Sequence, residues 1–258
     1  VVDASSFVIE VKTRDKRRMV KVSTGSFWRG SDEPAHPEEA PEAKLTQDTF
    51  WMDRTPVTAG QFARCVEAKR CQFSTYHLGR TKKDQSNRSP DCNFAVDDRQ
   101  DHPMNCVSWA GARAYCRWAG KKLPTEAQWE KAARGPKGSR FPWGNNGPDC
   151  ERVCAQSIAG SACGENEESA TCPVGQHPKG VSPYGAEDMS GNVLEWTADA
   201  FSPTIYSDDP QPHNAANLVH SATRTVRGGS FSSNTDALRC ASRAGLSAEA
   251  RTYWVGFR

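Results

Sequence analysis

Ten cysteines are spread along this chain of 258 residues, and they restrict its possible folds more than any other feature. Most of them lie in stretches rich in Gly, Pro or Ser, a setting typical of crosslinked loops. Zinc binding is the alternative, but the stretch from Cys150 to Cys172 has neither CxxC pairs nor a histidine between its cysteines. We therefore expect disulfides. The cysteines concerned are Cys65, Cys71, Cys92, Cys106, Cys116, Cys150, Cys154, Cys163, Cys172 and Cys240.

The cysteine content also indicates a compartment. Disulfides persist in oxidising surroundings, so we expect an extracytoplasmic protein, whether periplasmic, secreted or on the cell surface. Residues 1–10 do not combine a charged segment with a following apolar one, so we expect no signal peptide in this chain. The 33 Lys and Arg residues nearly balance 31 Asp and Glu residues, which argues against nucleic-acid binding and direct membrane insertion.

Three segments carry helix start signals. Thr58 and Thr125 are each followed three residues later by Gln, the pair that forms a capping box. Ser108 is a good first cap for a second helix, and Gly120 is placed to end that helix in a left-handed turn. The expected helices cover residues 58–69, 108–120 and 125 to about 133.

The remainder predicts strands and loops within a single domain, residues 1–258. Uneven alternation over 7–28 suggests a hairpin, and we expect 1–24 to be a strand extension. Residues 225–231 and 254–258 are predicted as two final strands that pair with each other. Residues 135–183 are rich in Gly and Pro and hold four cysteines, so they predict a disulfide-crosslinked loop region.

Ordered motifs then carry a resemblance to a known family. They are HPMNCVSW at 102–109, KKLPTEAQWEKAARG at 121–135, FPWGN at 141–145, SPYG at 182–185, DMSGNVLEW at 188–196, RGGSF at 227–231 and VGFR at 255–258. Together they resemble the formylglycine-generating enzyme, or sulfatase-modifying factor, family. The resemblance implies an α+β fold, an elaborated C-type-lectin-like fold with little regular secondary structure. That implication agrees with the loop-rich pattern.

The resemblance implies calcium as a cofactor. By similarity, its ligands would be the Asp188 and Glu195 side chains and the Gly191 and Val193 carbonyls. Two carboxylates around a Gly-containing turn suit a hard cation that takes oxygen ligands. Alternatively, Asp188 and Asn192 form turn hydrogen bonds only, and Glu195 begins a strand. The family's second calcium site would lie between 143 and 173, where cysteines replace its usual ligands, so we expect that site to be absent or altered.

The resemblance also implies an oxidase, and here the sequence departs from the family. The family reaction converts a sulfatase cysteine to formylglycine with oxygen and a copper ion held by two thiolates shortly after the Gly-Gly-Ser motif. Ser232 and Ser233 occupy that segment here, and the first available thiol is Cys240. Copper(I) needs soft sulfur ligands, so we expect no copper and no formylglycine-generating activity. Whether the chain is an enzyme of another kind stays open, although we lean against it.

Two other functions remain possible by resemblance. An oxidase of the siderophore-tailoring type would use Ser230, Ser233 or Trp196 near the cleft. A retroelement-diversified lectin-like receptor would vary the C-terminal segment. The histidines have no metal-site spacing and are expected on the surface or in turns. They are His36, His77, His102, His177, His213 and His220.

Because the copper-binding thiols are missing, the sequence favours a binding function over the family's catalytic one. Loops 232–238 and 244–253 are expected on one face of a stiff scaffold, where recognition is common. We therefore expect a non-catalytic binding or interaction module with a protein, peptide or glycan ligand on this face. The sequence does not indicate an oligomeric state. The candidate ligand-binding residues are Ser232, Ser233, Asn234, Asp236, Tyr253 and Trp254.

Only some cysteine pairings can be anticipated. Cys65 and Cys71 have a spacing that permits a local bridge without requiring one. In the family, the partner of Cys116 follows the Gly-Phe-Arg motif, and the partner of Cys240 would lie at Ala133. The resemblance therefore implies that Cys116 and Cys240 find different partners or stay free.

Overall fold

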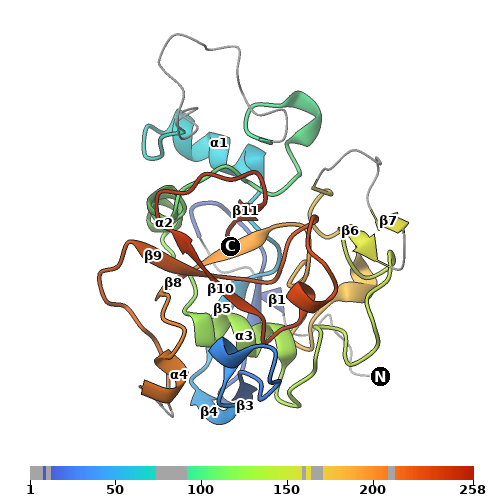
Figure 1. Cartoon of the computed structure of the whole chain (residues 1–258). Helices are drawn as coiled ribbons and strands as arrows, with labels where there is room; N and C mark the ends of the chain where they lie inside the picture. Colours follow the sequence, from blue (N-terminus) through green and yellow to red (C-terminus); the bar gives the residue numbers. More distant parts are fainter. Residues whose placement is uncertain (1–7, 10–12, 74–91, 159–160, 164–170, 209–212) are drawn as a thin grey trace.

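The computed structural model describes residues 8–9, 13–73, 92–158, 161–163, 171–208 and 213–258 (Figure 1). Within these ranges, side chains are described from residue 13 onward, apart from those of 156–158 and 161–163. Three helices of two to three turns and several short strands are joined by long irregular segments. None of the described helices is long and apolar enough to cross a bilayer.

The three predicted helices are confirmed: α1 (Ala59–Glu67), α2 (Trp109–Ala119) and α3 (Glu126–Arg134). Capping boxes begin α1 and α3, and Gly120 ends α2 in the left-handed conformation, with φ of 79°. A short fourth helix is α4 (Ile205–Asp208). The local start and stop signals were sufficient because each cap is completed within four residues.

Thr125→Ala should lower the free energy of unfolding by about 1 kcal/mol, because an N-cap hydroxyl is lost. Thr125 Oγ1 accepts from the backbone NH of Gln128 at 3.2 Å, and Gln128 Oε1 accepts from the backbone NH of Thr125 at 2.9 Å. Urea unfolding measures the loss. Thr235→Ala is the matched control, because Thr235 precedes a 3-10 turn without a side-chain cap bond. Equal losses in both variants would contradict the prediction.

The largest sheet has the strand order β10, β9, β8, β11. Its strands are β8 (Leu194–Ala200), β9 (Thr223–Arg227), β10 (Arg243–Ser247) and β11 (Val255–Gly256). β8 lies between β9 and β11, so the predicted pairing of 225–231 with 254–258 is wrong. The predicted loop 244–253 is also shorter, because its first residues belong to β10. Strand signals are local and do not say which strand is the neighbour.

Three smaller sheets complete the fold. β1 (Val8–Ile9), β2 (Met19–Val22) and β5 (Phe50–Asp53) form the first, β3 (Gly25–Arg29) and β4 (Ala43–Gln47) the second, and β6 (Ala155–Ile158) and β7 (Ser161–Cys163) the third. β1 and β2 pair antiparallel, as the hairpin prediction requires. That prediction is wrong for residues 25–28, because β3 pairs with β4 instead.

The core is organised around two fully buried tryptophans. Trp196 on β8 packs with Phe62 of α1 and Tyr115 of α2, while Trp129 of α3 packs with Val20 of β2. In Figure 1, α1 and α2 lie on one side of the four-stranded sheet and α3 on the other. The helices and strands therefore hold the connecting loops on a rigid centre.

Three disulfides are described: Cys65–Cys71, Cys92–Cys106 and Cys154–Cys172. Their Cα atoms are 5.3, 5.7 and 6.1 Å apart, which is ordinary bridge geometry. Cys150 is also disulfide-bonded, and the Cys163 side chain lies outside the described residues. These bridges fit an oxidising compartment.

The prediction of disulfides at all ten cysteines is corrected at Cys116 and Cys240, which are free thiols. Cys116 packs in the cluster around Trp196, and Cys240 packs in the cluster around Trp129. Burial raises the pKa of both thiols above its ordinary value, so they behave as small apolar side chains.

Candidate functional site

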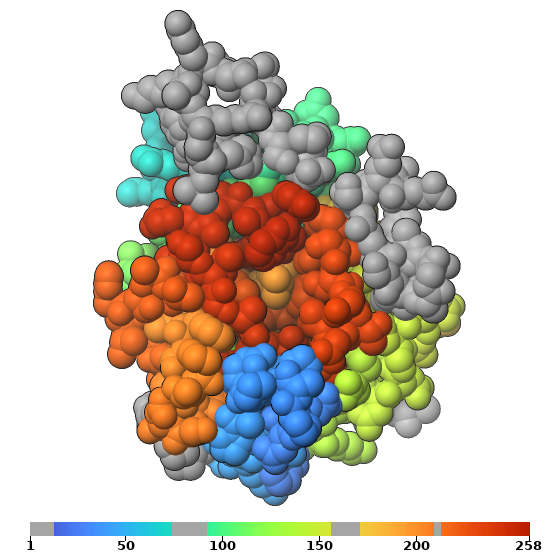
Figure 2. Space-filling view, in the orientation of Figure 1, coloured from blue at the N-terminus to red at the C-terminus, as the bar shows by residue number. Residues whose placement is uncertain are grey.

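A hollow lies on the face formed by the C-terminal segments. In Figure 2 the red C-terminal residues stand above it and the blue segment around residues 30–40 stands below it. The stretch that follows the Gly-Gly-Ser motif runs along the same face. This arrangement brings an N-terminal segment to the C-terminal loops, which the sequence analysis did not anticipate.

Three serine hydroxyls form one hydrogen-bonded group at the start of this stretch. Ser230 Oγ lies 3.0 Å from Ser232 Oγ and 3.3 Å from Ser233 Oγ. Ser233 Oγ also accepts from the backbone NH of Ser230 at 2.9 Å. Ser230 is buried, Ser233 is half-buried and Ser232 is exposed. Of the three hydroxyls, that of Ser232 is therefore the most accessible to a ligand.

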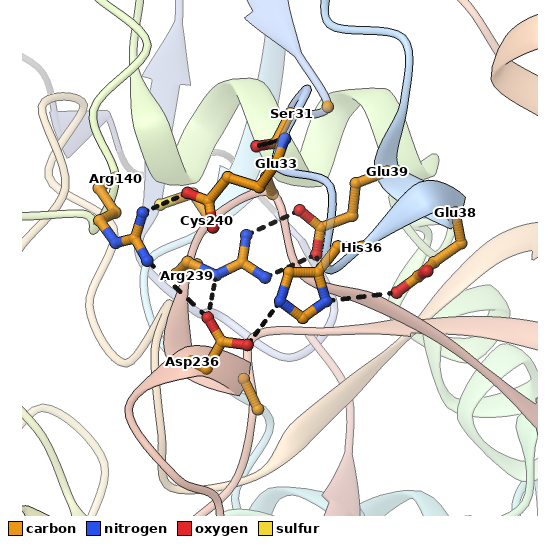
Figure 3. A network of polar contacts seen from close by, with 12 residues as sticks. Ser31, Glu33, His36, Glu38, Glu39, Arg140, Asp236, Arg239 and Cys240 are labelled. Atoms are coloured by element: carbon orange, nitrogen blue, oxygen red, sulfur yellow. Dashed lines mark hydrogen bonds and ion pairs between the residues drawn. The ribbon is translucent and has the colours of Figure 1, made fainter.

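A charged group, here named the His36 cluster, joins the two sides of this face (Figure 3). Its members are Glu33, His36, Glu38, Glu39, Arg140, Asp236 and Arg239. His36 Nε2 lies 2.6 Å from Asp236 Oδ2. Arg239 donates to both carboxylate oxygens of Glu39, at 2.7 and 2.9 Å, and through Nε to Asp236 at 2.7 Å. Segments about 200 residues apart are thus tied together.

The electrostatics of the cluster centre on Asp236. Burial acts to raise the pKa of this carboxyl, but the hydrogen bond and charge of Arg239, assisted by His36, outweigh burial and lower it. Arg140 also pairs with Glu33 and approaches Asp236 at 3.8 Å. The Asp236 carboxylate is therefore ionised and already carries cationic partners.

The cluster also contains a possible metal donor set. Ligand atoms of Glu33, His36 and Asp236 lie within 4.8 Å of one another, although no ion is part of the structure. One imidazole and two carboxylates suit a divalent transition metal. Sequence reasoning missed this group because only Glu33, Glu38 and Glu39 lie near His36 in the chain, whereas Asp236 is 200 residues away.

The remaining ligand-binding candidates differ in their exposure. Tyr253 is 38% exposed, and its ring centroid lies 6.0 Å from that of Phe231. Trp254 is half-buried against the Cys154–Cys172 disulfide. Asn234 is exposed, but its Oδ1 accepts from the backbone NH of Ala237 at 3.0 Å. Tyr253 is therefore the most exposed aromatic side chain among these candidates.

The predicted calcium turn lies in the core beneath this face. Asp188 is buried, accepts from the backbone NH of Gly175 at 2.7 Å, and has its pKa raised to about 6 by burial. Both oxygens of Glu195 meet Arg258, at 2.5 and 2.6 Å, and one also accepts from Trp129 Nε1 at 2.8 Å. Glu195 lies at the start of β8, in agreement with the alternative prediction that it begins a strand.

Asp188 and the two backbone carbonyls offer oxygen ligands of the kind that calcium takes, whereas both Glu195 oxygens are already held by Arg258 and one of them also by Trp129. The buried Asp188 carboxylate has no side-chain cation among the described residues at hydrogen-bond distance, so a bound cation would stabilise its charged form. Asn192 instead binds both backbone groups of Cys172, at 3.1 and 3.2 Å. These hydrogen bonds hold the turn against the Cys154–Cys172 disulfide.

The residues present do not fit a copper site of the two-thiolate type. Hydroxyls stand at Ser232 and Ser233, and the two described free thiols, Cys116 and Cys240, are buried in different core clusters. Their raised pKa values keep them protonated. Trp196 is also fully buried, with its indole donating to the Val107 carbonyl at 2.9 Å, so it packs in the core beneath the cleft surface.

Comparison with known proteins agrees with the motifs. The family model for the sulfatase-modifying factor enzyme 1-like domain matches residues 6–258. The formylglycine-generating enzyme of Mus musculus is 30% identical over 279 residues, covering 93% of this chain and 74% of the relative. That of Streptomyces coelicolor is 30% identical and covers 96% of this chain and 90% of the relative. Pkn1, a serine/threonine-protein kinase of Chlamydia caviae, is 34% identical over 93% of this chain, which spans only 37% of the kinase.

Solved structures with the same architecture confirm the α+β, formylglycine-generating-enzyme-like fold. PvdO from Pseudomonas aeruginosa superposes with a TM-score of 0.75 at 24% identity, covering 97% of this chain and 95% of the other. Variable protein 1 of Treponema denticola gives 0.64 at 19% identity, with 93% of each chain covered. Because the family model matches residues 6–258 and the motifs agree with it, this chain belongs to the family of sulfatase-modifying factor enzyme 1-like domains.

Proposed function

We propose that this domain is an extracytoplasmic binding module that uses the family scaffold without the family's thiol chemistry. One observation carries the proposal: the segment after the Gly-Gly-Ser motif presents hydroxyls at Ser232 and Ser233 and is tied down by ion pairs. A hydroxyl cannot replace a copper-binding thiolate. The same segment still borders a hollow on a rigid scaffold, which suits recognition.

The chemistry of the rim favours a charged peptide as the ligand. Glu33 and Asp236 offer partly exposed carboxylates, and Arg140 offers a partly exposed guanidinium. Tyr253 adds an exposed aromatic ring to the C-terminal loops. Charges of both signs around an aromatic anchor recognise peptide side chains better than they recognise a neutral glycan.

The catalytic alternative is tested directly. The protein is incubated with a sulfatase-motif peptide, copper and oxygen, and aldehyde is measured by mass spectrometry, with a formylglycine-generating enzyme as the positive control. We expect no aldehyde from this chain. Aldehyde formation would overturn the binding-only proposal.

The binding proposal is tested by selecting peptides from a random displayed library. Peptides bound at the hollow should lose roughly tenfold or more in affinity with Tyr253→Ala, as expected for an aromatic anchor. Trp28→Ala is the matched control, because Trp28 is equally exposed, at 38%, on β3. If no selected peptide distinguishes the two variants, the hollow is not the binding surface.

A second candidate function rests on the donor set of Glu33, His36 and Asp236. These residues would serve an oxidase that does not need the copper thiols, in the manner of the siderophore-tailoring type. Equilibrium dialysis against Mn²⁺ or Fe²⁺ separates the two proposals. Stoichiometric retention that disappears in His36→Gln would favour the enzyme over the binding module.

The retroelement-diversified receptor stays a hypothesis that the likeness to variable protein 1 makes worth testing. Its variable positions would have to be exposed, as Ser232, Asn234 and Tyr253 are. A template repeat beside the gene, differing from it at adenine-containing codons, would support this receptor function.

Calcium binding at the Asp188 turn is the remaining part of the proposal. Calcium at 100 times its dissociation constant should stabilise the protein by about 2.7 kcal/mol relative to a chelator. Asp188→Gly should abolish this gain, because it removes the carboxylate while its left-handed backbone, with φ of 52°, suits glycine. Thermal unfolding measures both, with the exposed Asp208→Asn as the control. Identical unfolding with calcium and chelator would contradict the site.

A further inference from the structure

A second concave site lies away from the hollow and is lined by different residues. It is a cavity of about 1060 Å³ between α2, the 120–125 connection, β5 and residues of the 218–224 segment. Ligand sites are typically about 300–1,000 Å³, so a small molecule fits. Phe50, Trp51 and Leu218 contribute apolar wall.

The lining of this cavity is strongly cationic. It includes six Lys and Arg side chains and a single carboxylate, that of Asp53. Asp53 is already neutralised, because it pairs with Arg17 at 2.5 Å and with Lys121 at 2.7 Å. Arg113, Arg117 and Lys122 are exposed and have no ion-pair partner in the described part of the chain. Excess positive charge therefore faces the cavity.

Arg224 is the buried cation in the lining of this cavity that no described carboxylate pairs with. It is only 6% exposed, yet no described carboxylate pairs with it, and its Nε has no hydrogen-bond partner. Its Nη1 donates to the carbonyls of Ala198 and Val219, both at 3.2 Å. A buried guanidinium without a counter-anion is costly, and a ligand anion would remove that cost.

The guanidinium is held in place by Trp109. The Arg224 guanidinium carbon lies 4.0 Å from the Trp109 ring centroid, and the indole is itself fixed by donating to the Thr197 carbonyl at 2.7 Å. Arg113 lies 5.2 Å from the same ring. Burial lowers the pKa of Arg224 and the charge of Arg113 adds to that effect, while the charge of the Asp199 carboxylate acts in the opposite direction without cancelling it.

We propose that this cavity binds an anionic small molecule with an apolar body, whose carboxylate pairs with Arg224 and Arg113 while its body lies against the apolar wall. The two guanidinium groups would hold the ligand carboxylate through charge-assisted hydrogen bonds, which are shorter and stronger than neutral ones. The site is independent of the proposed function of the hollow.

The probe is 2-naphthoate, titrated by calorimetry against its neutral analogue 2-naphthylmethanol at low salt. Naphthoate should bind one site at least about tenfold more tightly than the alcohol, the size of a charge-assisted hydrogen bond. Its affinity should fall as salt increases. Equal affinities for acid and alcohol, or no naphthoate binding, would overturn the proposal.

Substitutions of the arginines test whether naphthoate binds in this cavity. Arg224→Met should weaken naphthoate binding roughly tenfold or more, and the exposed double variant Arg113→Gln/Arg117→Gln should weaken it several-fold even if Arg224→Met does not fold. Arg251→Gln is the matched control, since Arg251 is a partly exposed arginine outside the cavity lining. If naphthoate binding is unchanged in the double variant, the anion lies elsewhere and the proposal fails.

Discussion

Glu130→Ala should lower the free energy of unfolding by about 3–5 kcal/mol, because it breaks a fully buried ion pair and leaves the Arg227 guanidinium with Glu126, 3.3 Å away, as its one described carboxylate partner. Glu130 on α3 and Arg227 on β9 are both completely buried, with Oε2 2.7 Å from Nη2. Glu130 Oε1 also accepts from the backbone NH of Gly30 at 2.8 Å and from Arg134 at 3.1 Å. One side chain thus joins α3, the main sheet and the end of β3.

The matched control is Glu151→Ala. Glu151 pairs with Lys179 at 2.8 Å, but both side chains are more than half exposed, so the loss should be about 0–1 kcal/mol. Chemical denaturation of both variants, with a shared slope, measures the difference. Similar losses would mean that the buried pair adds no more than a surface pair does.

Arg258→Met is expected to cost a similar amount, about 3–5 kcal/mol, because it leaves the buried Glu195 carboxylate without its cation. The Arg258 side chain is 3% exposed and, besides Glu195, donates to the backbone carbonyls of Asp53, Glu187 and Asp188. It therefore ties the C-terminal strand to the end of β5 and to the proposed calcium turn.

A double-mutant cycle isolates the pair. Glu195→Met with Arg258→Met should be less destabilised than the sum of the two single variants, since neither charge is then left buried alone. Arg251→Met, on the partly exposed arginine nearby in sequence, should change stability by about 0.5 kcal/mol or less. Additive losses in the cycle would show that Arg258 acts through its backbone contacts instead.

The helices could be predicted because their signals are short-range. Thr58, Ser108 and Thr125 each cap a helix through a backbone NH three residues away, and Gly120 ends α2 by its left-handed backbone. No distant contact is needed to complete these motifs. The family could be predicted for the same reason, since its motifs are contiguous runs of the chain.

The site could be predicted only in part. Ser232 and Tyr253 were expected on the ligand face, and both side chains are exposed in the structure. The cluster of His36 with Asp236 could not be found, because its partners are separated by 200 residues and meet only through ion pairs. The cavity at Arg224 was missed for a similar reason, as its cations come from α2, from the connection that follows α2, from β9 and from Arg258.

The sequence by itself determined the three capped helices, the family, and the lack of any thiol between Cys172 and Cys240. Only the tertiary structure decided that β8 separates β9 from β11, that Cys116 and Cys240 stay free, and that charged residues from both ends of the chain meet in the His36 cluster. The physical reason is how far apart in the sequence the interacting residues lie. Caps and motifs depend on neighbours within a few residues, whereas strand order, buried ion pairs and thiol environments depend on which distant segments pack together.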